Sequence, residues 1–180
     1  MDKVYLHGKA FVPFIGALKI QERIASLCKE IESDCKETHP VFIVVLKGAF
    51  LFAADLLKCW NHQTEIGFIR LSSYQGTSSS GNVREVSPHG LKLENRHVIV
   101  LEDIVDTGIT CDYLFDRLKS ENPASVKLVT LLYKPDAFKG NNKPNYIGFE
   151  VGNEFLVGYG LDYDELGRNL PDIYQIETHA

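Results

Sequence analysis

Residues 98 to 110 read VIVLEDIVDTGIT. The apolar, β-branched beginning of this segment is typical of a strand buried in a parallel sheet that is covered on both faces. Glu102 and Asp103 follow, and residues 106–110 form a short polar turn before a segment of helical character at 113–118. Because backbone N–H groups at the start of a helix point at a ligand, this order predicts an anion site between a strand and a helix.

The adjacent carboxylates of Glu102 and Asp103 suit a different part of the same ligand. They repel an anion, but they accept hydrogen bonds from hydroxyl groups and can coordinate a hard cation. A ligand with a phosphate at one end and a diol or a metal at the other is a sugar phosphate. The competing interpretation is an ordinary Asp-Thr-Gly turn in which Thr110 caps the next helix. The strand and the carboxylates before the turn favour the phosphate site.

The composition is that of a chain able to form one domain with a sizeable core. It has 180 residues, of which 44% are hydrophobic and 24% charged, as in ordinary soluble proteins. The net charge of −5 argues against nonspecific binding to nucleic acid or to an anionic membrane. An anionic substrate must therefore be held locally, by backbone amides, a metal and a few cations.

No segment has the pattern of a targeting or membrane sequence. Met1-Asp2-Lys3 is not followed by an apolar core, and Val41 to Leu57 is interrupted by Lys47 and Asp55. Neither a signal peptide nor a membrane span is therefore expected. The four cysteines show no C-x-x-C spacing, which favours reduced, buried thiols. We expect a cytoplasmic protein.

Helical and strand patterns alternate along the chain. Apolar residues at helical spacing predict an amphipathic helix over Ala17–Ser33, with Arg23 among the charged residues expected to face solvent. The other predicted helices are Ala49–Trp60 and Cys111–Ser120, and the other predicted strands are Val41–Leu46, Thr64–Leu71, Ser125–Leu132, Asn145–Glu150 and Phe155–Gly160. Gln75–Pro88 is predicted as a loop, with a short hairpin around Asn82–Val86. This alternation predicts an α/β fold with a mainly parallel sheet.

Polar residues follow several predicted strands at the points where the strands end. They are Lys47-Gly48, Ser73-Tyr74, Glu102-Asp103 and Lys134. In open α/β sheets, ligands bind at the carboxyl ends of the strands. We therefore expect these residues, which are far apart in the sequence, to face one crevice.

The segment Val98 to Thr110 resembles the 5-phosphoribosyl-1-diphosphate (PRPP) signature of the type I phosphoribosyltransferases. From Val41 to Arg168 the order of motifs is similar to that of the hypoxanthine-guanine phosphoribosyltransferases of the short bacterial type. The resemblance implies a mainly parallel, twisted sheet flanked by helices, with a small hood built from the N- and C-terminal segments. Residues 1–180 would form a single domain, with its core at about 38–150.

The resemblance also implies an activity. N9 of hypoxanthine or guanine would attack C1 of magnesium-bound PRPP, giving IMP or GMP and diphosphate in purine salvage. The implied cofactor is Mg²⁺, and the implied substrates are a 6-oxopurine base and PRPP. A homodimer or homotetramer is also implied, and Phe11, Phe14 and Trp60 could serve an interface or simply the core.

The resemblance assigns the PRPP site to the central segment. The residues that would wrap the 5′-phosphate are Asp106, Thr107, Gly108, Ile109 and Thr110. Glu102 and Asp103 would meet the ribose hydroxyls, with the magnesium close by, and Asp106 would act as acid or base at purine N7. Vertebrate relatives carry lysine where this chain has Ile109, but a cradle of backbone N–H groups tolerates an apolar side chain.

Two further segments match PRPP-binding positions of the family. Lys47-Gly48 resembles the diphosphate loop, in which the peptide before the lysine can be cis, and Arg168 matches a second diphosphate position. Ser73 and Tyr74 would be contacts of a lid that excludes water from the reacting ribosyl cation. The alternatives are a solvated lysine beside a tight turn, a flexible surface loop, and a surface ion pair for Arg168.

The purine site is implied by three later segments. Lys134 would donate to purine O6 and so reject adenine, although without the resemblance it would be an exposed lysine at a strand end. Phe155 would cover the purine ring and the Leu156 backbone would meet its Watson–Crick edge, whereas the pattern alone predicts a core strand here. Asp162 would contribute to this site and bind a second metal.

Two alternatives to this function stay open. The chain could prefer xanthine or accept all three 6-oxopurines, because Lys134 distinguishes substituents only at C6. It could instead be a nucleotide-binding regulator of the same fold with no transferase activity. The acidic composition argues against RNA binding, and the complete set of Lys47, Glu102, Asp103, Asp106 and Lys134 argues against an inactive relative.

Overall fold

The computed structural model describes residues 2–35, 37–73, 83–88 and 90–177, which form three helices and ten strands. The helices are α1 (Ala17–Cys35), α2 (Phe50–Cys59) and α3 (Ile109–Lys119). The strands are β1 (Val4–Leu6), β2 (Lys9–Ile15), β3 (Val41–Leu46), β4 (Ile66–Ser73), β5 (Val83–Ser87), β6 (His97–Val105), β7 (Ser125–Tyr133), β8 (Tyr146–Glu150), β9 (Leu156–Val157) and β10 (Ile173–Ile176).

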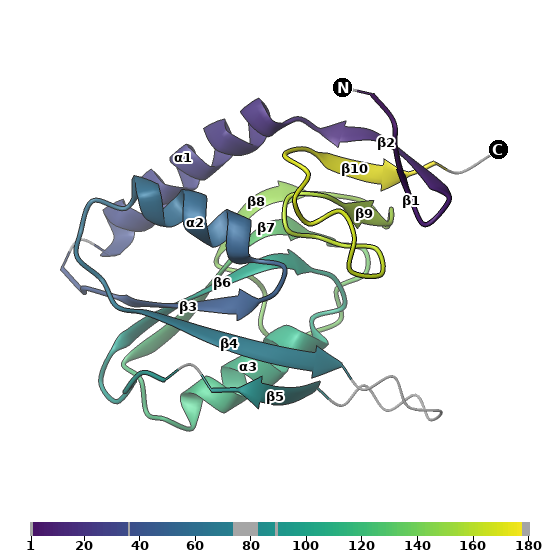
Figure 1. Cartoon of the computed structure of the whole chain (residues 1–180). Coiled ribbons are helices and arrows are strands. Elements are labelled where there is room, and N and C mark those ends of the chain that lie inside the picture. The colour runs from purple at the N-terminus through teal and green to yellow at the C-terminus, as the bar shows by residue number, and fades with distance from the viewer. Residues whose placement is uncertain (1, 36, 74–82, 89, 178–180) are drawn as a thin grey trace.

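These strands form two sheets of different kinds (Figure 1). The larger sheet has the order β5-β4-β3-β6-β7-β8, and all of its neighbouring strands are parallel except β5, which runs antiparallel to β4. The smaller sheet is antiparallel, with the order β1-β2-β10-β9. We call this smaller sheet and the turns between β9 and β10 the hood. The predicted α/β fold with a mainly parallel sheet and a hood is confirmed.

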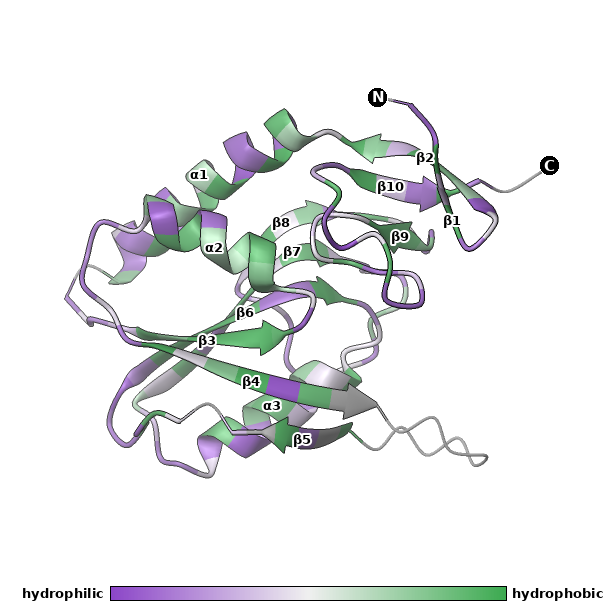
Figure 2. Cartoon of the chain, in the orientation of Figure 1, coloured by the Kyte–Doolittle hydropathy of each residue, from purple (hydrophilic) through white to green (hydrophobic). Residues whose placement is uncertain are grey.

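Strand β3 shows why the central strands are apolar at almost every position. Its first five residues are buried, and they alternate between the two faces of the sheet. Phe42 and Val44 belong to the core cluster on one face, whereas Val41, Ile43 and Val45 belong to the cluster on the other. Hydropathy colouring accordingly shows β3 as apolar along its length (Figure 2). A strand covered on both faces has no side that faces solvent, so its residues are apolar at nearly every position.

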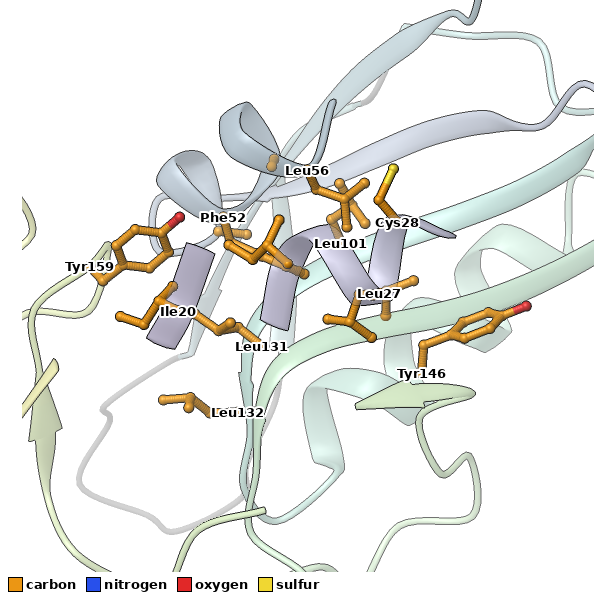
Figure 3. Packing of buried hydrophobic residues seen from close by; sticks show 14 of the residues in the cluster. Ile20, Leu27, Cys28, Phe52, Leu56, Leu101, Leu131, Leu132, Tyr146 and Tyr159 are labelled. Carbon is orange, nitrogen blue, oxygen red and sulfur yellow. The ribbon is translucent and has the colours of Figure 1, made fainter. Parts of the chain in front are cut away.

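Helices α1 and α2 cover one face of the large sheet and α3 covers the other (Figure 1). The apolar stripe of α1 packs its fully buried residues Ile20 and Leu27 beside Phe52 and Leu56 of α2 (Figure 3). Of the candidate interface residues, Phe11 and Trp60 are buried, while Phe14 is 38% exposed. Phe11 and Trp60 therefore belong to the core.

The edge strand β8 corrects one expectation for α1. Arg23 was expected to face solvent, but its guanidinium donates to the carbonyl oxygens of Ile147 and Gly148 at 2.7 and 2.8 Å. An edge strand has unpaired carbonyl groups, and a fork of N–H donors can satisfy two of them. Arg23 of α1 thus satisfies two backbone carbonyl groups at the edge of the large sheet.

The hood corrects the predicted strand Phe155–Gly160. Only Leu156 and Val157 form a strand, because Gly158, Tyr159 and Gly160 have φ values of 95°, 48° and 100°. Left-handed backbone cannot continue a pleated strand.

Short hydrogen bonds attach the hood to both α1 and α2. Asp172 Oδ1 accepts a hydrogen bond from the backbone N–H of Ala17 at 2.7 Å, at the start of α1. The Tyr159 hydroxyl donates to Asp55 Oδ2 of α2 at 2.6 Å. Both contacts anchor the hood on the side to which β3, β4 and β6 point (Figure 1). In the described part of the chain, no helix combines the length and apolar character needed to cross a membrane.

We expect Leu27→Ala to lower the free energy of unfolding by about 2–5 kcal/mol, because it leaves a cavity under α1. Leu18→Ala is the matched control in the same helix, since Leu18 is 75% exposed, and it should change stability by less than about 0.5 kcal/mol. Urea unfolding of both variants measures the difference. Equal effects would contradict the assignment of Leu27 to the core.

Candidate active site

A cleft of about 220 Å³ lies at the carboxyl ends of the central strands. Its lining comes from four separate parts of the chain, as expected for the crevice of an open α/β sheet. The lining residues are Val45, Leu46, Gly48, Leu71, Val83, Glu102, Asp103 and Thr110. The prediction that Gly48 lies in one crevice with Glu102 and Asp103 is therefore confirmed.

The turn after β6 leads directly into the first turn of α3. Gly108 is the N-cap residue of α3, with φ 89°, and no side chain of the described residues caps this helix. A Cβ at Gly108 would lie 2.5 Å from the Phe138 ring, so the position has neither the backbone nor the space for a side chain. Thr110 lies inside the helix instead of capping it. The first-turn amides of α3 are therefore open to an anion.

Glu102 and Asp103 are two acids in a poorly solvated place. Glu102 is 7% exposed, and its Oε2 atom is buried without a hydrogen-bond partner among the described residues. Burial raises the pKa of the Glu102 carboxyl well above its ordinary value, and the neighbouring Asp103 carboxylate adds to the rise. Burial also raises the pKa of Asp103, although its Oδ1 accepts a hydrogen bond from the Ile104 N–H at 2.9 Å.

At Gly48 the turn after β3 packs closely against the Asp103 carboxylate and against Gly160 of the hood. A Cβ at Gly48 would lie 1.5 Å from Asp103 Oδ2, and a Cβ at Gly160 would lie 2.0 Å from the Gly48 carbonyl oxygen. The Leu46–Lys47 peptide bond before it is cis. Only glycine at both positions allows these backbones to approach so closely.

Lys47 and Arg168 form a small cationic group beside this turn. Lys47 Nζ donates to the two carboxylate oxygens of Glu165 at 2.7 and 2.8 Å. Arg168 donates to the Gly160 carbonyl at 2.9 Å and pairs with Asp162 at 2.7 Å. The hydrogen bonds from Lys47 and its charge hold the pKa of Glu165 below its ordinary value. Both cations are thus occupied by acids of the hood.

Lys134 and Asp106 form the other charged pair of the site. Lys134 directly follows the last residue of β7. It is 8% exposed, and its Nζ donates to Asp106 Oδ2 at 3.0 Å. Its backbone N–H donates to the Val105 carbonyl, which fixes the strand end beside the turn. Asp106 itself is half exposed, with 48% of its side chain accessible. The alternative of an exposed lysine at this strand end is therefore wrong.

The remaining predicted residues belong to β9 and the segments on either side of it, to the turn leading into α3 and to the end of β4. Phe155 is 46% exposed and packs edge-on against Tyr163, whereas Leu156 is buried in β9. Asp162 is engaged by Arg168 and by the Glu165 N–H. The exposed side chains in the turn are Asp106, Thr107 and Ile109. Ser73 is the last residue of β4, and Tyr74 lies outside the described residues.

Glu102 and Asp103 suit a metal ion whose remaining ligands come from the substrate and water. No group of three or more His, Cys, Asp or Glu side chains among the described residues is arranged as a metal site. Magnesium characteristically takes one or two carboxylates and completes its shell with water and substrate oxygens. The buried, unpartnered oxygen of Glu102 beside Asp103 fits that requirement.

Sequence reasoning missed Glu165 and Gly160. Glu165 is one of several acids in a short hood segment, and no local pattern distinguishes it from Asp164. Gly160 matters only because Gly48 lies opposite, and that contact joins residues more than a hundred positions apart. Long-range contacts of this kind leave no short-range signal.

The fold and the site together define an α/β protein with an open helix start and two poorly solvated carboxylates at the carboxyl ends of its parallel strands. Residues 16–164 match the phosphoribosyl transferase domain family. The chain is 37% identical to the hypoxanthine-guanine phosphoribosyltransferase of Aquifex aeolicus, over 96% of this chain and 98% of that protein. It is 42% identical to that of Bacillus subtilis, over 88% and 89%.

A crystal structure of a hypoxanthine-guanine phosphoribosyltransferase from Bacillus anthracis has a TM-score of 0.86 to this structure. Its sequence identity is 37%, and the match covers 92% of this chain and 96% of that chain. This chain belongs to the phosphoribosyltransferase family and, within it, to the hypoxanthine-guanine phosphoribosyltransferases.

We expect Glu102→Gln to raise the free energy of unfolding by about 1 kcal/mol at neutral pH in the absence of metal. The raised pKa means that the folded state binds this proton more tightly than the unfolded chain does. Stability therefore falls as pH rises above the ordinary glutamate pKa of about 4.3, and glutamine avoids that loss.

Urea unfolding at neutral pH and near that ordinary pKa tests this, because the advantage of glutamine should shrink at the lower pH. Glu94→Gln, at an exposed position, is the control and should show neither effect. A destabilised Glu102→Gln variant would mean that the carboxylate makes a stabilising contact.

Proposed function

We propose that this protein transfers the 5-phosphoribosyl group of PRPP to N9 of hypoxanthine or guanine. The bond between C1 and the diphosphate breaks, a bond between N9 and C1 forms, and the base loses one proton. The products are IMP or GMP and diphosphate.

The Lys134–Asp106 pair is the observation that carries this proposal. Its two charged groups lie 3.0 Å apart beside the turn that leads into α3. The O6 and N7 atoms of a 6-oxopurine are neighbours on one edge of the base. Lys134 would donate to O6. The Asp106 carboxylate would accept the N7 proton of the tautomer whose unprotonated N9 attacks C1, so that the proton lost by the base ends on Asp106. Adenine would present an amino group to the lysine and be rejected.

The rest of PRPP fits the remaining groups. The 5′-phosphate would lie on the first-turn amides of α3, with residues 106–110 around it. Glu102 and Asp103 would accept hydrogen bonds from the ribose hydroxyls. The same carboxylates, and Asp162 at a second position, would hold magnesium, which supplies positive charge to the diphosphate. The diphosphate itself would be bound by Lys47, the Gly48 amide and Arg168.

The base would be held by the hood. The exposed ring of Phe155 offers a stacking surface for the purine, and the backbone of Leu156 would meet its Watson–Crick edge near Asp162. Ser73 and Tyr74 would contact the substrate as part of a lid that excludes water from the ribosyl cation. We treat sheet and hood as one domain over residues 1–180, because the purine and PRPP would bind between them.

We further propose that the enzyme is cytoplasmic and forms a homodimer or homotetramer. Several large apolar side chains outside the site are exposed and could be covered by a second copy. They are Phe14, Phe50, Ile66 and Phe68. Light scattering coupled to gel filtration measures the number of subunits, and a strictly monomeric protein would contradict this.

An absorbance assay with PRPP and magnesium, run with hypoxanthine, guanine, xanthine and adenine, tests the function directly. Turnover of hypoxanthine and guanine, inert adenine, and loss of activity on chelation of the metal are expected. A strong preference for xanthine would reassign the substrate. No turnover of any purine by folded protein would favour the nucleotide-binding regulator.

We expect Lys134→Gln to lower kcat/KM for hypoxanthine by about 10- to 100-fold, the loss of one hydrogen bond to a charged donor. Selectivity against adenine should fall as well, because the glutamine carbonyl can accept from the adenine amino group. Lys139→Gln, in the following turn at an exposed position, is the control and should keep both values. Unchanged selectivity in Lys134→Gln would remove Lys134 from the purine site.

A further inference from the structure

One hood carboxylate lies between two cations of the site. Glu165 receives both of its hydrogen bonds from Lys47 Nζ, at 2.7 and 2.8 Å, and lies 3.8 Å from the Arg168 guanidinium. These are the two cations that the proposed function assigns to the diphosphate. A carboxylate with two oxygens therefore stands where two phosphate oxygens would be expected.

The two cations differ in how much they depend on Glu165. Arg168 is held independently, by Asp162 at 2.7 Å and by the Gly160 carbonyl at 2.9 Å. Among the described residues, Glu165 is the only hydrogen-bond partner of the Lys47 ammonium. Both members of this pair are exposed, at 44% and 67% of their side chains. The pair can therefore open without disturbing the core.

The backbone at Glu165 is unusual for glutamate. Asp164 and Glu165 have φ values of 46° and 69°, and Gly167 follows at 101°. Aspartate tolerates this left-handed region, but glutamate rarely occupies it, and glycine or asparagine would suit position 165 better. The backbone conformation at position 165 does not favour glutamate. The feature specific to glutamate here is the contact of its carboxylate with Lys47.

We propose that Glu165 is an internal substitute for the diphosphate: it holds Lys47 in the unliganded protein and is displaced when PRPP binds. The inference rests on the proposed function, because that function gives Lys47 and Arg168 their ligand. A ligand that must first open an existing pair binds with an apparent affinity lowered by the stability of that pair. After catalysis, the same carboxylate competes with the product and speeds the release of diphosphate.

Glu165→Gln tests this, because glutamine keeps the size of the side chain and removes its charge. We expect KM for PRPP to fall by roughly two- to fivefold, the range that one exposed ion pair supports. The inhibition constant of inorganic diphosphate, with magnesium, should fall by a similar factor. KM for hypoxanthine should not change. A group that merely stabilised the hood would not separate these constants in this way.

Asp164→Asn is the matched control, since it removes the same charge one residue away and Asp164 has no ion pair with either cation in the described chain. An equal fall of KM for PRPP in Asp164→Asn would overturn the proposal in favour of a general charge effect. An unchanged or higher KM in Glu165→Gln, with active parent enzyme, would also overturn it and leave the proposed function intact.

Calorimetry with magnesium and inorganic diphosphate separates the inference from the proposed function. Tighter binding by Glu165→Gln than by the parent protein supports the inference even if no purine is turned over. Equal binding by both proteins overturns it. Absence of turnover by the parent protein, in contrast, counts only against the transferase function.

Discussion

The close approach of Asp103, Gly48 and Gly160 is the constraint on which the site depends. The Asp103 carboxylate occupies the space that a side chain at position 48 would need, and the Gly48 carbonyl does the same for position 160. The turn after β3 thereby contacts the hood directly through backbone atoms of Gly48 and Gly160. Because packed backbone cannot change rotamer as a side chain can, this contact fixes the distance between the turn after β3 and the hood.

The large sheet contains an electrostatically unfavourable pair of carboxylates near its centre. Two neighbouring carboxylates at the end of β6 are poorly solvated, and one oxygen of Glu102 has no partner among the described residues. Such an arrangement is unfavourable for folding and is useful only when hydroxyl groups or a cation arrive. The two hydrophobic core clusters, one on each face of the large sheet, offset this loss of folding free energy.

The sequence predicted the large sheet well and the hood poorly. Val98 to Leu101 and Val41 to Val45 are apolar without interruption, a pattern that only a strand covered on both faces requires. The hood strands are short and paired across long distances, and Pro13 within β2 has no N–H to donate. Their pairing, and the salt bridge of Lys47 with Glu165, follow from tertiary contacts that no local pattern encodes.

The pairing of β2 with β10 has a consequence for the order in which the molecule is completed. Residues 11–15 of β2 are synthesised long before their hydrogen-bond partners at 173–176. All strands of the large sheet lie within residues 41–150, so they are synthesised while β2 still lacks β10. The hood is therefore completed after the strands of the large sheet have been synthesised, by a pairing between segments far apart in the sequence.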